Sequence, residues 1–194
     1  GYVERQVRRW GEQWGRSKTR EVPVVDETMR RLKGAIPVSP APTIVHGDYR
    51  FGNMILNAND PGHVEAILDW EMATLGDPLS DLAYTLIYWG EMADSPERLA
   101  LRTMAAVTAQ PGFWTRGQIV EAYGQRSGRD VSAIDFYQVL AYYKLAVICE
   151  GIHARYLAGE TVGEGFDTYA EMSHNLCAMA LEIADESADR KLHG

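Results

Sequence analysis

Apolar residues recur at helical spacing along most of the chain. Val3, Val7 and Trp10 are separated by four and then three residues, which predicts an amphipathic helix over residues 2–14. The same kind of pattern predicts further helices at residues 26–33, 96–109, 115–125, 133–157 and 167–186. Within the longest of these, the run LAYYKLAVIC is apolar nearly all round, which favours a central buried helix.

Strand-like patterns are confined to one short part of the sequence. The runs TIV (43–45), MIL (54–56) and VEAILDW (64–70) are apolar and short, and Asp60-Pro61-Gly62 between the last two is a typical turn. Asp77 followed by Pro78 then predicts the start of a helix. The pattern therefore predicts a mainly helical α+β protein with a small β-hairpin.

The hairpin pairing predicts which polar side chains meet. An antiparallel register that buries Ile55 opposite Ile67 places Asn53 opposite Asp69. Asp48 lies five residues before Asn53, in the segment that leads into the hairpin. Three oxygen-bearing side chains are therefore expected to converge at the open end of this hairpin.

These residue types suit phosphoryl transfer. A carboxylate and a carboxamide are oxygen ligands of the kind that Mg²⁺ takes, with waters and substrate phosphates in the remaining positions. A second carboxylate that is not a primary ligand can accept the proton of an attacking hydroxyl. Asp48 is thus the candidate base, and Asn53 and Asp69 are the candidate metal ligands.

Charge and cysteine content limit the classes of partner and the cellular compartments that we expect for the protein. The formal net charge is −8 and no Lys/Arg run exceeds two residues, so neither a nucleic-acid partner nor a membrane surface is expected. No apolar stretch approaches the roughly 18 residues of a membrane span. Cys149 and Cys177 lie far apart and form no C-x-x-C motif, which indicates reduced thiols and a cytoplasmic location.

Two motifs together resemble a known family. HGDYRFGN (46–53) followed by ILDWE (67–71) resembles the catalytic core of aminoglycoside phosphotransferase-like kinases, which share the protein-kinase-like fold. GDPLSDLA (76–83) is similar to the segment after the metal-binding aspartate of that family. HGDYRFGNMI, ILDWEMATLGDPLSDLAY and GIHARYLAG resemble more narrowly the branch associated with acyl-CoA dehydrogenases. The resemblance extends over most of the chain.

The resemblance implies a role for each matching residue. Asp48 corresponds to the catalytic base, and Asn53 and Asp69 correspond to the Mg²⁺ ligands. His46 corresponds to the loop histidine, which orients the loop more than it takes part in the chemistry. Asp81 corresponds to an acidic residue that braces the backbone of the catalytic loop. Arg50 and Glu71 lie near the site and are candidate substrate contacts.

The family also uses an N-terminal lobe, whose features are not found in this sequence. GEQWGRSKT (11–19) lacks the spacing G-x-x-x-x-G-K-[ST] of a phosphate-binding loop, and no strand precedes it. The chain begins at Gly1 within a helix-like segment. We therefore expect residues 1–194 to be the C-terminal catalytic and acceptor-binding lobe, without the N-terminal nucleotide-binding lobe and inactive without it.

The leading hypothesis is ATP- and Mg²⁺-dependent phosphorylation of a small-molecule hydroxyl group. The acidic chain favours a cationic acceptor such as an aminoglycoside, whereas the narrower resemblance implies a hydroxyacyl-CoA-type acceptor. A non-catalytic, pseudokinase-like module that binds a metabolite or a partner is the main alternative. A metal-dependent hydrolase using His46, Asp48, Asp69 and His63 is a further one, weakened because His63 falls in the hairpin turn.

The predicted long helix carries charged residues whose roles stay open at this stage. Lys144, Glu150, His153 and Arg155 are assigned either to an ion pair on the buried helix or to the wall of the acceptor pocket.

Overall fold

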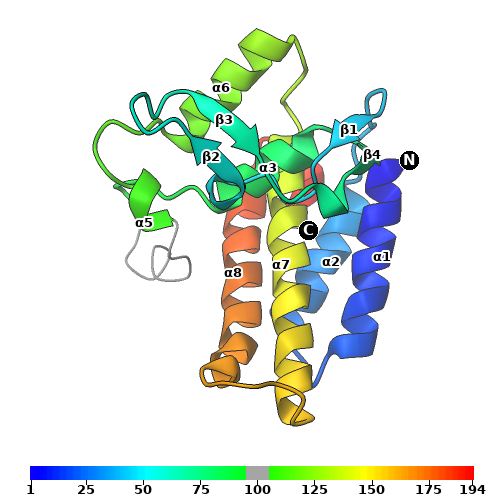
Figure 1. Cartoon of the computed structure of the whole chain (residues 1–194). Coiled ribbons are helices and arrows are strands. Elements are labelled where there is room, and N and C mark those ends of the chain that lie inside the picture. Colours follow the sequence, from blue (N-terminus) through cyan, green and yellow to red (C-terminus); the bar gives the residue numbers. More distant parts are fainter. Residues whose placement is uncertain (95–104) are drawn as a thin grey trace. The chain divides into compact units, whose positions relative to one another are not determined.

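The computed structural model describes residues 1–94 and 105–194, which divide into two compact units (Figure 1). The helical unit combines Gly1–Ser39 with Asp135–Gly194. The second unit is Pro40–Ile134, which we call the catalytic unit because the predicted site residues lie in it. Helices dominate the described residues, and the strands in them form two small antiparallel pairs. This is the mainly helical α+β fold that the sequence predicts.

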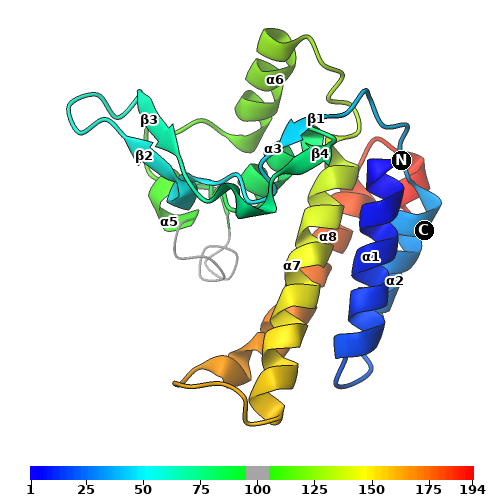
Figure 2. The ribbon, with the colours of Figure 1, turned by 45° about the vertical axis from the view of Figure 1, so that its right-hand side comes forward.

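The helical unit is built from long helices that run side by side (Figures 1 and 2). These are α1 (Tyr2–Ser17), α2 (Pro23–Gly34), α7 (Ile134–Leu157) and α8 (Tyr169–Glu186). Short 3-10 helices lie before and after α8, at Phe166–Thr168 (η3) and Arg190–Leu192 (η4). Among the described residues, no helix combines the length and the apolar composition that a membrane crossing requires.

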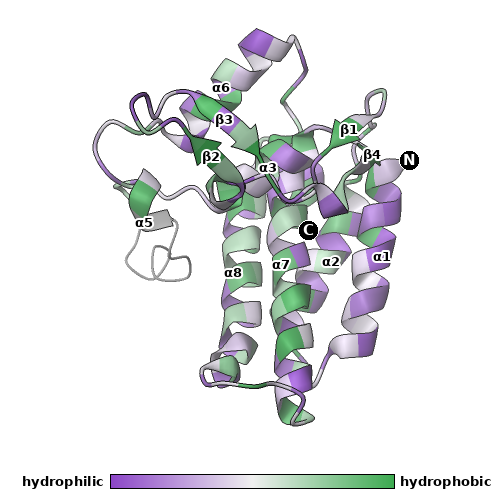
Figure 3. Cartoon of the chain, in the orientation of Figure 1, coloured by the Kyte–Doolittle hydropathy of each residue, from purple (hydrophilic) through white to green (hydrophobic). Residues whose placement is uncertain are grey.

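Helix α7 supplies much of the buried surface of the helical unit. Tyr142, Tyr143 and Val139 are almost completely buried, and Figure 3 shows hydrophobic residues along the length of this helix. Burial of this many apolar side chains is the main stabilising contribution to the unit. The prediction of a buried helix over residues 133–157 is confirmed.

A buried carboxylate on α7 holds the loop that joins α1 to α2. Glu150 is fully buried and accepts hydrogen bonds from the backbone amide of Thr19 at 3.0 Å and from its hydroxyl at 2.7 Å. The Arg20 guanidinium donates to both Glu150 oxygens at 2.9 Å and to the carbonyl of Ala170 at 2.6 Å. The ionic partner of Glu150 is therefore Arg20, which lies in the loop between α1 and α2 and not on α7.

The catalytic unit contains two separate strand pairs. Strand β1 (Thr43–Val45) pairs antiparallel with β4 (Thr74–Gly76), and β2 (Met54–Leu56) pairs antiparallel with β3 (Val64–Ile67). The predicted strands at 43–45 and 54–56 are confirmed. The third predicted strand, over 64–70, ends earlier, and β4 is an element that the sequence pattern did not predict.

The register of the hairpin differs from the predicted one by a single position. Met54 pairs with Ile67 and Ile55 pairs with Ala66, with an irregularity directly after Ile55. Consequently Asn53 lies opposite Leu68, whose amide donates to the Asn53 carbonyl at 2.8 Å. The prediction failed because Ile55 remains 47% exposed, so its burial does not select a register.

Helix α3 (Leu79–Ile87) follows β4 and begins with a capping contact. Oδ1 of Asp77 accepts a hydrogen bond from the Leu79 amide at 3.1 Å. This contact satisfies one of the amides that a helix leaves without an intrahelical partner at its start. Asp77 thus contacts the start of the helix, but the N-cap position is Pro78, one residue later than predicted, and the helix begins at Leu79.

The remaining helices of the catalytic unit are α5 (Ala105–Thr108) and α6 (Arg116–Ser127). Thr115 caps α6, because its hydroxyl accepts from the Gln118 amide at 3.2 Å. The helix predicted over residues 96–109 lies largely outside the described residues, and α5 covers its described end.

The backbone makes a close approach where the chain leaves β1. Gly47 has a φ of +86°, and a Cβ atom placed on it would lie 2.9 Å from the carbonyl oxygen of Met72. Met72 belongs to a short 3-10 helix, Trp70–Met72 (η2), between β3 and β4. Only glycine combines the left-handed conformation with the absence of a side chain at this contact.

Replacing Glu150 by alanine is expected to destabilise the helical unit by about 2–4 kcal/mol, because it leaves a half-buried arginine and a backbone amide without their acceptor. The free energy of unfolding, measured by urea denaturation, checks this. Glu182→Ala, on the exposed side of α8, is the control and should stay within about 0.5 kcal/mol of the wild type. Equal losses in the two variants would contradict the assigned role of Glu150.

Gly47→Ala is expected to destabilise the protein by more than Gly128→Ala. Both glycines have positive φ, but nothing lies within 4 Å of a Cβ at Gly128. The control therefore reports the conformational cost alone, about 1–2 kcal/mol, whereas Gly47→Ala adds a clash with the Met72 backbone. Similar midpoints of urea denaturation for the two variants would contradict the close approach.

Candidate functional site

The candidate site is formed by the segment that joins β1 to β2. Val45 at the end of β1 is buried and anchors the start of the segment, and Gly47 turns the chain away from the strand. A short 3-10 helix, Phe51–Asn53 (η1), then leads directly into β2. The segment between these anchors is therefore fixed at both ends. We call it the catalytic loop (residues 46–53), after the role predicted for Asp48.

Asp81 at the start of α3 holds the catalytic loop by its backbone. Its Oδ2 accepts from the His46 amide at 2.6 Å, and its Oδ1 accepts from the Gly47 amide at 2.8 Å. A carboxylate that accepts from amides forms charge-assisted hydrogen bonds, which are stronger than neutral ones. Each oxygen is therefore engaged by the backbone, which is the contact that the predicted supporting role of Asp81 requires.

His46 is buried and acts within the loop. Its Nδ1 lies 3.3 Å from the amide nitrogen of Asp48, and its Nε2 lies 2.7 Å from the carbonyl oxygen of Leu68. Because the Asp48 amide is a donor, Nδ1 accepts and Nε2 carries the proton that is donated to Leu68. The ring also lies 4.8 Å from that of Trp70, centroid to centroid. These contacts assign His46 to orientation of the loop.

Asn53 fixes the position of the Asp48 carboxylate. Its Nδ2 donates to the Asp48 backbone carbonyl at 2.8 Å and to Oδ2 of the same residue at 2.7 Å. Asn53 is buried, whereas the Asp48 side chain is 17% exposed. Since both contacts use the amide nitrogen, the side-chain oxygen of Asn53 is left for another ligand.

Arg50 makes the second contact with the Asp48 carboxylate. Its Nε lies 3.1 Å from Oδ1 and 3.2 Å from Oδ2, and its guanidinium carbon lies 5.4 Å from the centre of the Tyr88 ring. Burial lowers the pKa of Arg50, but the hydrogen bond and charge of Asp48 outweigh burial and raise it overall. The guanidinium therefore stays positively charged beside the candidate base.

The tyrosines near this ion pair do not compete with Asp48 as bases. Burial raises the pKa of Tyr84 strongly, and Tyr88 and the Asp48 carboxylate raise it further. Burial and the charge of Asp81 also raise the pKa of Tyr49. These two hydroxyl groups hold their protons at neutral pH, which leaves Asp48 as the candidate base.

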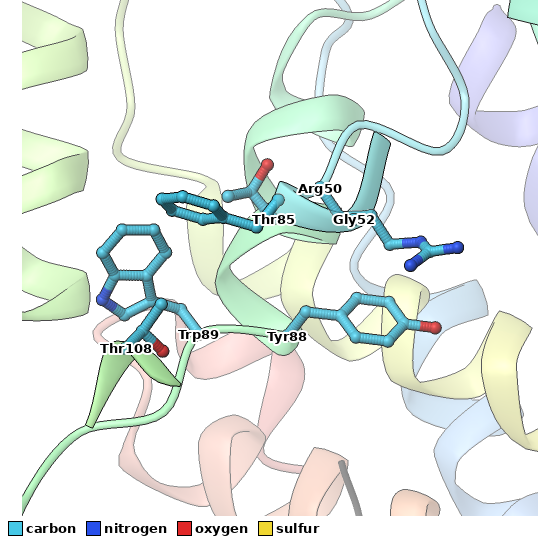
Figure 4. Close-up of a pocket in the computed structure, with 7 residues that line it drawn as sticks. Arg50, Gly52, Thr85, Tyr88, Trp89 and Thr108 are labelled. Atoms are coloured by element: carbon cyan, nitrogen blue, oxygen red, sulfur yellow. The ribbon is translucent and has the colours of Figure 1, made fainter. Parts of the chain in front are cut away.

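A small cavity of about 10 Å³ lies beside the loop (Figure 4). It has room for roughly one water molecule. Its lining comes from the catalytic loop, from α3 and the two residues that follow it, and from α5, namely Arg50, Phe51, Gly52, Thr85, Tyr88, Trp89 and Thr108. Figure 4 shows the Arg50 guanidinium and the Tyr88 hydroxyl pointing in the same direction, away from Trp89 and Thr108.

Asp69 follows β3 in an unusual conformation. Its φ is 66°, and among the described residues it is the one position outside glycine with a positive φ. Such a conformation costs roughly 1–2 kcal/mol for a residue with a side chain, and strain of this kind is concentrated at functional sites. The side chain is exposed and has no hydrogen-bond or ion-pair partner in the described part of the chain.

The predicted site residues are therefore brought together only in part. His46, Asp48, Arg50, Asn53 and Asp81 are joined by direct hydrogen bonds within the catalytic loop and α3. Asp69 has no direct bond to this group, but the backbone of its neighbour Leu68 hydrogen-bonds to both His46 and Asn53. Glu71 is exposed and makes no such contact among the described residues.

The geometry does not support the hydrolase hypothesis. In the described ranges, no three His, Cys, Asp or Glu side chains form a group that could hold a metal ion. His63 lies in the hairpin turn, where its amide donates to the Asp60 carbonyl and its carbonyl accepts from Asn57. It is therefore part of the turn.

Sequence reasoning missed two parts of the site. Tyr88 contacts Arg50 and lies four residues after Tyr84 on α3, a spacing that would have placed both on one helix face. The Leu68 backbone links His46, Asn53 and the start of the Asp69 turn, but a backbone contact leaves no mark in the residue type.

Comparison with known proteins identifies relatives along nearly the whole chain. Acyl-CoA dehydrogenase family member 11 of Gallus gallus is 29% identical over 95% of the chain, and Acyl-CoA dehydrogenase family member 10 of Mus musculus is 27% identical over 97%. The chain spans 24% and 18% of the lengths of these two relatives. It is thus similar to a limited part of each of them.

A solved structure has the same fold. The crystal structure of a candidate aminoglycoside phosphotransferase from Ralstonia eutropha superposes with a TM-score of 0.79 at 28% identity. The match covers 97% of this chain and 57% of that protein. The mainly helical α+β architecture described above is therefore shared with a kinase-like aminoglycoside phosphotransferase structure.

The model of the phosphotransferase enzyme family matches residues 1–117, which include β1 to β4, the catalytic loop and α3. This range is more than half of the chain and holds every residue of the candidate site. The chain therefore belongs to the phosphotransferase enzyme family.

Proposed function

We propose that the chain contributes the catalytic base and the metal ligands for ATP- and Mg²⁺-dependent transfer of a phosphoryl group to a hydroxyl of a small molecule. The observation that carries the proposal is the oriented Asp48 carboxylate. Asn53 and Arg50 hold it from two sides, yet it is 17% exposed and retains lone pairs for a substrate hydroxyl. Membership of the phosphotransferase family supports this reaction class.

The three polar groups of the catalytic loop divide the work. Asp48 accepts the proton of the attacking hydroxyl, because its side chain is partly exposed and its oxygens retain lone pairs, while both oxygens of Asp81 are engaged by the backbone. His46 keeps the Asp48 amide and the Leu68 carbonyl in place and is too enclosed to meet a substrate. Asn53 restricts rotation of the Asp48 side chain, so little conformational entropy of that side chain remains to be lost in the transition state.

The residues present fit a magnesium ion that is held partly by phosphate oxygens. The carbonyl oxygen of Asn53 and the unpaired carboxylate of Asp69 would be its protein ligands, a number typical for Mg²⁺ bound with a nucleotide. When bound, the ion neutralises negative charge on the phosphate oxygens. The strained φ of Asp69 is consistent with a conformation kept for ligation.

Much of the grip on ATP is proposed to come from an N-terminal lobe outside these residues. The chain spans 57% of the related crystal structure, and its own sequence has no phosphate-binding glycine loop. In this proposal residues 1–194 are the C-terminal catalytic and acceptor-binding lobe. The relatives' names favour a hydroxyacyl-CoA-type acceptor, and that of the Ralstonia eutropha protein favours an aminoglycoside.

Asp48→Asn in the native full-length protein is expected to lower kcat by about 10²–10⁴-fold, because the amide keeps the shape of the carboxylate and cannot take the proton. Steady-state transfer of labelled phosphate from ATP to acceptor checks this. Asp60→Asn, in the exposed hairpin turn, is the control and should keep full turnover. Full turnover in Asp48→Asn would refute the base, and nucleotide binding without any turnover in the wild type would favour a non-catalytic, pseudokinase-like module.

Asp69→Asn is expected to raise the Mg²⁺ concentration for half-maximal activity by about 10-fold or more, because it removes one ligand charge. A magnesium titration of the same transfer assay measures it. The control is Glu121→Gln on α6, which removes an exposed carboxylate from the same unit that accepts from Gln125 and takes part in none of the site contacts described above. An unchanged magnesium dependence in Asp69→Asn would remove this residue from the ligand set.

A further inference from the structure

Arg50 is an isolated positive charge at the candidate site. It is the only Lys or Arg in the sequence between Lys33 and Arg98, although that stretch includes Asp48, Asp69 and Asp81. An arginine placed alone among acidic residues and against the base needs a physical reason. An ion pair that only neutralises Asp48 is the simplest explanation, and the geometry argues for more than that.

The guanidinium uses only part of its donor capacity. Its contact with both Asp48 oxygens comes from Nε alone, at 3.1 and 3.2 Å. In an arginine–carboxylate pair built for strength, two parallel N–H groups face the two oxygens. Within the described residues, neither Nη1 nor Nη2 of Arg50 has a hydrogen-bond partner. Four N–H donors next to the base are thus left over.

These spare donors are held in one orientation. The guanidinium lies over the Tyr88 ring, and the Asp48 contact fixes its Nε end. On the other side Nη1 lies against Gly52, where a Cβ atom would come within 2.6 Å of it. The Arg50 side chain is 31% exposed, so part of it is accessible while most of its surface is covered. Figure 4 shows the guanidinium at the end of the side chain, turned away from Trp89 and Thr108. A fixed, partly desolvated fork is suited to binding a planar anion.

We propose that the Nη edge of Arg50 binds a carboxylate of the acceptor, so that the substrate is a hydroxy acid whose hydroxyl reaches Asp48. The inference deepens the proposed function and rests on it, since it concerns the acceptor of the same reaction. It selects a free hydroxy acid over a hydroxyacyl-CoA, whose carboxyl group is a thioester and carries no negative charge. Asp48 would receive the hydroxyl proton while its neighbour two residues along holds the anionic end of the same molecule. Only a short spacer can separate the two groups, because both protein partners belong to one ion pair.

The inference reverses the expectation from net charge. The chain carries a formal charge of −8, which favours a cationic acceptor at long range. Exposed charges farther apart than about 10 Å are largely screened by salt, whereas a direct arginine contact is not. The local donor geometry at Arg50 therefore decides the sign of the acceptor charge at the reacting centre.

The test compares acceptors that differ in charge on one carbon skeleton. Glycolate, glycolamide and ethanolamine each offer a primary hydroxyl and are anionic, neutral and cationic. We expect the native full-length protein to show a kcat/KM for glycolate about 10–100-fold above that for glycolamide. Arg50→Gln should abolish that preference, mainly through KM for glycolate, and Arg50→Lys should retain part of it, since lysine keeps the charge without the fork.

Arg126→Gln is the matched control. Arg126 also lies over an aromatic ring, at 6.0 Å from that of Trp114, and belongs to the same unit. Among the described residues it has no carboxylate partner, and it lies outside the site. The preference for glycolate should be unchanged in this variant. An equal fall of kcat for all three acceptors in Arg50→Gln would overturn the inference, because it would assign Arg50 to the transferred phosphoryl group. A preference for ethanolamine in the wild type would overturn it as well.

A binding measurement separates this inference from the proposed function. Glycolate and glycolamide are titrated into the wild type, and the side-chain Nε–H resonance of Arg50 is followed by nuclear magnetic resonance; the absence of this signal from Arg50→Gln assigns it. A shift caused by glycolate alone supports the carboxylate site even if no acceptor is phosphorylated, an outcome that would refute only the kinase activity. No difference between glycolate and glycolamide would refute the carboxylate site even if phosphorylation is observed.

Discussion

The site depends on two hydrogen bonds from backbone amides to one carboxylate. As the chain leaves β1, Asp81 accepts hydrogen bonds from the backbone amides of both His46 and Gly47. Because a buried amide without a partner is costly, this contact selects the path of the catalytic loop. The positions of His46 and Asp48 follow from that path, and Asn53 then closes the loop against Asp48.

Two aspartates close in space acquire different capacities from their hydrogen bonds. Asp81 has both oxygens committed to the backbone and contributes rigidity. Asp48 is bound by two side chains, of which Arg50 offers only one N–H, so its oxygens retain room for a further donor. The role that each carboxylate can take thus depends on how many of its acceptor lone pairs remain without a hydrogen bond. The residue type alone does not reveal this number.

Local patterns predicted most elements, and long-range contacts were harder to predict. Apolar runs were enough for Thr43–Val45 and Met54–Leu56, and helical spacing was enough for α7. The hairpin register was mispredicted because Ile55 is exposed and an irregularity follows it. The order of Asp48, Asn53 and Asp69 was visible in the motif. The left-handed backbone of Asp69 and the partner of Glu150, from a loop 130 residues away, depend on tertiary context that no local pattern encodes.

The hydrogen bonds and ring contacts that shape the site all join residues between His46 and Tyr88. Closing such short loops costs little chain entropy, so the site can assemble from one uninterrupted stretch of sequence. A gene fusion whose boundaries fall outside this stretch therefore transfers all of the site residues together. This is consistent with the match to Acyl-CoA dehydrogenase family member 11, in which the similar region is 24% of the length of that relative.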